Sequence, residues 1–255
     1  MPFKLIFFTI LIIFGKLIPQ DSAPPQLTFP RGITLEYGLG SYSVKDEYIS
    51  KEKYSGTLPY YSLSWMRHHE TYVFRLDMSY RNSDEIENYN VNTTITQFTL
   101  RQGFLYSLKN ISILQKELHV WLGPSTEFYF FYNDQNIAVS GFDYAQSLAS
   151  LFSAGLDLYG IYPLWNKLQL ESALKFTALS LGLRLIDTDE DDQSPVKILT
   201  LFSGVNAGFD LGARYYFLHR LSITLAYKFE LTRISAWEPL LSASDNVILG
   251  LNYNF

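Results

Sequence analysis

The feature that most constrains the fold is a strict two-residue alternation of apolar and polar side chains near the C-terminus. From Leu221 to Leu231 every odd position is leucine, isoleucine, tyrosine or phenylalanine, while the even positions are serine, threonine, alanine, lysine and glutamate. The odd positions from Val247 to Phe255 are likewise all apolar or aromatic. A period of two is that of a β-strand with one apolar face. After residue 30 no apolar run approaches the length of a membrane-spanning helix, so the chain is predicted to be all-β.

The same alternation recurs along the chain and predicts about ten strands, with eight or twelve as the alternatives. Composition agrees, because the 19 Phe and 19 Tyr are side chains that favour pleated, half-buried surfaces. The apolar phase changes from even to odd between Phe176 and Leu179, and Pro124 lies inside a strand without an amide hydrogen, so both positions predict β-bulges. The predicted strands span residues 31–44, 57–68, 71–82, 94–108, 115–132, 147–163, 167–186, 197–217, 220–235 and 244–255.

The connections between these strands alternate between short and long. Tight turns are predicted at His69-Glu70, Lys109-Asn110, Trp165-Asn166 and His219. Transmembrane β-barrels have short periplasmic turns and longer extracellular loops, and an even strand number places both termini on one side. The pattern predicts an antiparallel up-and-down transmembrane β-barrel. The longer segments are residues 45–56, 83–93, 133–146, 187–196 and 236–243.

The N-terminus has the pattern of a signal peptide, assigned to residues 1–20. Lys4 precedes an apolar run from Leu5 to Phe14 that only Thr9 interrupts. That run is shorter than the roughly 20 residues a spanning helix needs, so export is favoured over the alternative of a retained anchor. The sequence does not define the cleavage point. Residues 21–30 form a short N-terminal segment, and residues 31–255 form the barrel domain.

Composition excludes several kinds of chemistry. The net charge of −5 offers no basic field for nucleic acid, and the absence of cysteine excludes disulfides, thiol nucleophiles, cysteine-liganded zinc and lipoprotein attachment. No cofactor is expected.

With its export signal, alternating strands and alternating loop lengths, the chain resembles bacterial outer-membrane β-barrel proteins over residues 31–255. No named subfamily is identified. In that family a last strand that ends in phenylalanine is the signal read by the barrel-assembly machinery. The resemblance therefore implies a bacterial outer-membrane location, contact with membrane lipid and lipopolysaccharide, and an assembly signal made of Leu249, Leu251, Tyr253 and Phe255.

If the apolar faces meet lipid, the opposite faces line the lumen with balanced charge. Turns centred on residues 166 and 219 set Asp157 opposite Lys175 and Asp210 opposite Lys228, which predicts cross-strand ion pairs. Eight-stranded barrels are filled with side chains and open aqueous channels are typical of sixteen or more strands, so a largely filled lumen is expected. The predicted network comprises Arg75, Asp77, Arg101, Glu127, Asp157, Lys175, Asp210, Arg214, Lys228 and Glu230, and the inward set also includes Glu36, Arg81, Glu117, His119, Glu171 and Arg184.

These features favour a structural or surface-interaction barrel and leave three alternatives open. The first is a small diffusion channel of the porin type. The second is a membrane-embedded hydrolase, although His119 and Ser125 on one strand would lie roughly 20 Å apart, too far to act together. The third is a secreted soluble barrel of lipocalin type, with apolar side chains inside.

One loop has the composition of a weak calcium site. Asp187, Asp189 and Asp191 alternate along the most acidic segment of the chain. The segment lacks the glycine and distal glutamate of a calcium-binding loop, so a solvated loop is favoured.

Overall fold

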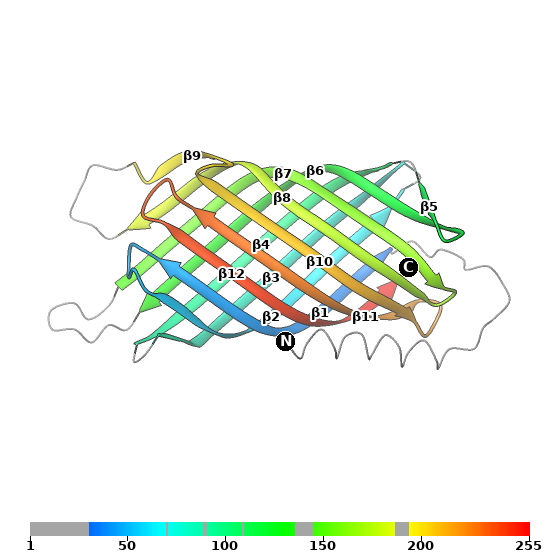
Figure 1. Ribbon diagram of the computed structural model, residues 1–255, viewed down its shortest axis with the longest axis horizontal. Coiled ribbons are helices and arrows are strands. Elements are labelled where there is room, and N and C mark those ends of the chain that lie inside the picture. The colour runs from blue at the N-terminus through cyan, green and yellow to red at the C-terminus, as the bar shows by residue number, and fades with distance from the viewer. Residues whose placement is uncertain (1–30, 70, 89–90, 109, 136–144, 187–193) are drawn as a thin grey trace.

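The strands of the computed structural model form one closed antiparallel barrel (Figure 1). The structure describes residues 31–255 apart from residues 70, 89–90, 109, 136–144 and 187–193. No helix that is long and apolar enough to cross a membrane occurs in this described part of the chain. The strands are β1 (Gly32–Asp46), β2 (Lys53–His68), β3 (Tyr72–Asn88), β4 (Val91–Ser107), β5 (Ile111–Ile113), β6 (Lys116–Gln135), β7 (Ala145–Trp165), β8 (Leu168–Ile186), β9 (Val196–Thr200), β10 (Gly204–Tyr216), β11 (Leu221–Ile234) and β12 (Leu240–Asn254).

Ten of these strands build the barrel wall. Each pairs antiparallel with its neighbours in the order β1, β2, β3, β4, β6, β7, β8, β10, β11 and β12, and β1 closes the circle on β12 from Gly32↔Asn254 to Asp46↔Leu240. The predicted all-β fold and the count of ten strands are therefore confirmed. The short strands β5 and β9 are additional, and they lie at opposite ends of the barrel (Figure 1). We call the end that carries the β2–β3, β7–β8 and β10–β11 connections the turn end, and the other the loop end.

The two faces of the wall differ in polarity as the alternation predicts. Outward side chains are large and apolar, for example Leu35 and Leu249, which are 60% and 61% exposed. Inward side chains include charged residues such as Arg81, Arg101 and Arg184, which are buried. This arrangement is the reverse of a soluble barrel, which would hold its apolar faces inside.

The bulge predicted from the change of apolar phase is present, and the one predicted at Pro124 is not. In β8 the register with β7 shifts between Gly155↔Thr177 and Ala154↔Leu179, so Ala178 is the extra residue. β6 keeps its register with β7 through Pro124. The ladder between β6 and β4 is interrupted beside Pro124, because proline has no N–H to donate, but it resumes in the same register.

Three predicted segments differ clearly from the structure. The predicted loop 83–93 is mostly strand, since β3 continues to Asn88 and β4 begins at Val91. The predicted turn at Lys109-Asn110 is followed by β5, which forms a small hairpin with the start of β6. The predicted strand 197–217 is broken into β9 and β10 by a turn over residues 201–203.

That break leaves a seam in the wall at the loop end, between β9 and the residues that follow β11. β9 pairs with β8 from Leu179↔Thr200 to Leu183↔Val196, and no ladder joins it to β11 in the described part of the chain. Side chains close the seam instead. The Lys197 ammonium donates to the Ala236 carbonyl at 2.7 Å, and the Trp237 indole N–H donates to the Ser194 carbonyl at 3.1 Å.

Apolar side chains also occupy the lumen near both of its ends. At the turn end one cluster brings together Val73, Leu105, Trp121, Tyr159 and Ile161. At the loop end a larger cluster includes Tyr42, Phe131, Leu151, Leu199 and Trp237. Along β3 and β6, buried or half-buried polar residues lie between the members of the two clusters, so the lumen is layered.

Close contact between β1 and β12 gives one test of the wall. A Cβ on Gly40 would lie 1.7 Å from the main-chain oxygen of Asp245, whereas a Cβ on Gly208 would meet nothing nearer than 3.5 Å. We therefore expect Gly40→Ala to lower the free energy of unfolding by roughly 3 kcal/mol, because the strands must separate to fit the methyl group. Gly208→Ala is the matched control. Denaturant titration of the refolded barrels in micelles measures both, and equal stability of the two variants would contradict this close approach.

Candidate functional site

The candidate site is the charged layer of the lumen, whose charged residues come from eight of the ten wall strands. Because successive side chains of a strand point to opposite faces, charges at every second position converge inside the closed wall. All ten residues of the predicted network take part in ion pairs there.

Arg75 and Asp77 of β3, Lys175 of β8 and Asp210 of β10 form one cluster. Arg75 Nε lies 2.7 Å from Asp77 Oδ2, and Lys175 Nζ lies 3.1 Å from Asp210 Oδ2. Longer contacts join the two pairs, at 3.7 Å from Arg75 to Asp210 and 3.8 Å from Lys175 to Asp77. Two cations and two anions thus neutralise one another between strands that face each other across the lumen.

A second cluster surrounds Arg101 of β4. Its Nε donates to both carboxylate oxygens of Asp157, at 3.0 and 3.1 Å, and its Nη1 donates to Glu127 at 2.6 Å. Ser125 contacts both Arg101 and Asp157, and the amide of Asn206 donates to Glu127 at 2.6 Å. One guanidinium therefore satisfies two buried carboxylates, an arrangement that uses the planar fork of arginine.

Two further cations share the face of Tyr60. The guanidinium carbon of Arg81 and the ammonium of Lys228 lie 4.7 and 5.3 Å from the centre of its ring. Arg81 also pairs with Glu230, and Lys228 with Glu36, both at 2.5 Å. Tyr60 is a buried member of the site that the sequence analysis missed, since it considered only charged inward residues.

The predicted register is confirmed, but the predicted partners are wrong. Asp157 lies opposite Lys175 and Asp210 opposite Lys228 in the ladders, as the turn positions indicate. The recorded ion pairs instead join Asp157 to Arg101, Lys175 to Asp210 and Lys228 to Glu36. Lys175 reaches Asp210 diagonally on the adjacent strand β10, while the other two pairs join strands that are two apart in the sheet. Long side chains therefore pair with charges other than the one directly opposite.

The predicted inward set needs one replacement. Glu117 belongs to the β5–β6 hairpin, where its side chain is largely exposed and accepts a hydrogen bond from Asn110. Asp46, which the sequence analysis placed in a loop, ends β1 and is buried against Arg184 and Ser147. Continuing the alternation of Tyr42 and Val44 by one step would have found it.

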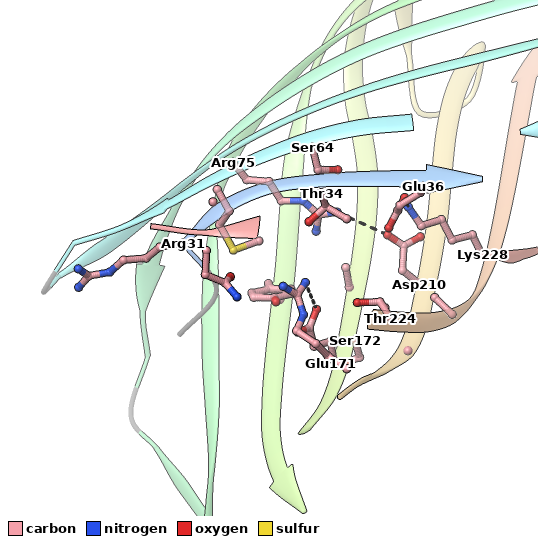
Figure 2. A pocket seen from close by; sticks show the side chains of 18 residues that line it. Arg31, Thr34, Glu36, Ser64, Arg75, Glu171, Ser172, Asp210, Thr224 and Lys228 are labelled. Carbon is pink, nitrogen blue, oxygen red and sulfur yellow. Dashed lines mark hydrogen bonds and ion pairs between the residues drawn. The ribbon is translucent and has the colours of Figure 1, made fainter. Parts of the chain in front are cut away.

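A cavity of about 60 Å³ opens beside these clusters, toward the turn end. Figure 2 shows Arg75, Asp210, Glu171 and Lys228 around it, with the ion pairs that hold them. The Tyr159 hydroxyl is buried at this cavity and has no hydrogen-bond partner within the described part of the chain. Buried polar groups are normally hydrogen-bonded to protein or water, so the cavity suits a few water molecules or a small polar molecule.

The geometry gives no support to the hydrolase alternative at the residues considered. Ser125 and Glu127 are engaged by Arg101, while His119 pairs with Ile161 in the ladder and its recorded acidic neighbour is Glu117 at 3.8 Å. No group of three or more metal-ligating side chains occurs among the described residues. Asp187, Asp189 and Asp191 lie outside the described residues, as does the N-terminal segment 1–30.

The residues of the predicted assembly signal share the outward face of β12. Leu249, Leu251 and Tyr253 are exposed there, as is Phe255 just beyond the strand. The rings of Tyr253 and Phe255 lie 6.4 Å apart. The structure thus places the four side chains on one surface facing away from the lumen.

Arg101 allows a direct test of the buried network. We expect Arg101→Met to lower the free energy of unfolding by about 3–5 kcal/mol, because Asp157 and Glu127 would remain buried without their cation. Arg67→Met, at an exposed position of β2, is the control and should change stability by less than about 1 kcal/mol. Denaturant titration compares them, and a loss for Arg101→Met no greater than the control's would contradict a coupled buried cluster.

Comparison with known proteins agrees with the architecture. No family model matches the sequence, and no curated protein matches it. Among solved structures, the outer-membrane protease OmpT from Escherichia coli superimposes with a TM-score of 0.51 at 9% identity, covering 90% of this chain and 99% of that one. The translocator domain of the autotransporter NalP from Neisseria meningitidis gives a TM-score of 0.43 at 10% identity, covering 98% and 95%. The OmpT superposition shows that this chain has the closed-barrel fold of that outer-membrane protein.

Proposed function

We propose that this protein is an integral outer-membrane barrel that does not conduct, with a structural or surface-interaction role. The observation that carries the proposal is the layered lumen, in which apolar clusters lie on either side of a charge-neutralised middle. The cavity of about 60 Å³ and a second one of about 30 Å³ beside Arg101 have room for only a few water molecules or a small polar molecule. A diffusion channel would instead need a continuous water-filled path through the lumen.

The membrane location has support of its own. An outward wall of leucine, tyrosine and phenylalanine side chains would be costly in water and is suited to lipid. We place the turn end, where β1 begins and β12 ends, on the periplasmic side. The loop end then faces the outside among lipopolysaccharide, and any external partner would bind there because the lumen is filled.

Conductance across a planar bilayer tests the proposal. We expect the refolded wild-type protein to give no discrete current steps, because the cavities described in the lumen are small. Insertion is verified separately by flotation of the protein with lipid vesicles, so that an absence of current steps cannot be due to a failure to insert. The double variant Asp157→Ala/Asp210→Ala is recorded alongside. Steps in the wild type that change in size in the double variant would overturn the filled-lumen proposal and favour a channel.

The outward C-terminal face gives a test of export and assembly. We expect Phe255→Ser to reduce the amount of folded protein recovered in the outer membrane several-fold, because the terminal ring would belong to the signal for assembly. Phe202→Ser is the control, since Phe202 is also exposed, at 91%, but follows β9 at the opposite end. Membrane fractionation measures both, and equal recovery of the two variants would refute a role for Phe255.

A further inference from the structure

The hairpin formed by β5 and the start of β6, residues 111–118, stands apart from the barrel wall at the turn end (Figure 1). Ile111 pairs with Leu118, and Ile113 pairs with Lys116, on one face of this ribbon. Ser112 pairs with Glu117 on the other face. The hairpin is therefore amphipathic, although it is too small to have a core of its own.

The tip of the hairpin is apolar, exposed and strained. Leu114 is 87% exposed and has a φ of 49°, and Gln115 follows with a φ of 64°. Two-residue turns of this kind favour asparagine and glycine, because positive φ is costly for other residues. A leucine here does not ease the turn, and most of its side chain is exposed, so we expect its role to depend on contacts with another molecule.

The apolar face of the hairpin continues the outward wall of the barrel. Ile113, Leu114 and Leu118 line a groove of about 280 Å³ together with Tyr162, Leu170 and Leu211 from β7, β8 and β10. The groove is thus bounded by the hairpin on one side and by the outward surface of the wall on the other.

Two contacts hold the hairpin in this position. The Tyr162 hydroxyl donates to the Ile113 carbonyl at 3.0 Å, and the Lys116 ammonium donates to the Leu164 carbonyl. Tyrosine and tryptophan side chains are enriched at the boundary between lipid and water, and Trp165 ends the same strand as Tyr162. The hairpin is therefore tied to the wall at the level expected for the lipid headgroups.

We propose that the β5–β6 hairpin is a lipid-binding foot, with Leu114 and the groove behind it in contact with phospholipid acyl chains of the periplasmic leaflet. The proposal rests on the membrane location proposed above. Lipid fits because the groove is lined mainly by apolar side chains and is continuous with the wall, while Ser112, Glu117 and Asn110 on the other face are suited to headgroups and water.

The cysteine-free chain allows single spin labels to test this foot. Leu114→Cys, Ser112→Cys and Leu249→Cys are each labelled with a nitroxide and refolded into phospholipid vesicles, with circular dichroism as the check on folding. The measurement is the ratio of accessibility to oxygen, which concentrates in lipid, over accessibility to a water-soluble nickel chelate. We expect the ratio at Leu114 to approach that at Leu249 on the wall and to exceed that at Ser112 several-fold.

Comparing the three labelled positions distinguishes failure of the lipid-binding proposal from failure of the proposed membrane location. A ratio at Leu114 as low as at Ser112, with a high ratio at Leu249, would overturn the foot and leave the membrane location standing. A low ratio at Leu249 as well would overturn the membrane location. Shielding of the Leu114 label from both reagents would indicate a protein partner in place of lipid, and would also overturn the proposal.

Discussion

Closure of the backbone ladder between β1 and β12 is the constraint on which the rest of this structure depends. Inside a bilayer an unpaired N–H or C=O costs several kcal/mol, so a sheet can cross only if its first and last strands pair. Here that pairing runs the whole length of β1. Closing only ten strands makes a narrow tube, and the two-residue period of each strand then decides which side chains face outward and which are confined together in the lumen.

Confinement explains why the lumen charges are so fully paired. A buried charge without a partner is strongly unfavourable, whereas a guanidinium such as that of Arg101 can serve two carboxylates at once. The clusters also tie together strands that are not neighbours in the sheet, since Arg81 of β3 reaches Glu230 of β11 and Arg184 of β8 reaches Asp46 of β1. These contacts cross-link distant parts of the wall, a structural use of charge that agrees with the proposed non-conducting barrel.

The sequence predicts the wall well and the lumen only in outline, for a physical reason. Turn positions determine which residues of neighbouring strands lie opposite, so the register of Asp157 with Lys175 and the bulge at Ala178 follow from local pattern. The partner of Lys228 is Glu36, two strands away, and that depends on how the whole sheet curves and closes. The apolar cluster at the loop end was missed because Tyr129 and Phe131 in β6 alternate with the outward-facing Phe128 and Phe130. With apolar side chains on both faces, the two-residue period is hidden.

The seam beside β9 gives the barrel an uneven resistance to opening. The ten wall strands are joined by backbone ladders, whose hydrogen bonds break cooperatively. Between β9 and residues 235–237 the wall is held instead by a few separate hydrogen bonds, two of them from Lys197 and Trp237. Separate bonds can break one at a time, so this segment belongs to the low-stability end of the fold. Local opening of the wall is therefore expected to begin at the loop end, beside β9, rather than at the charged layer in the middle of the lumen.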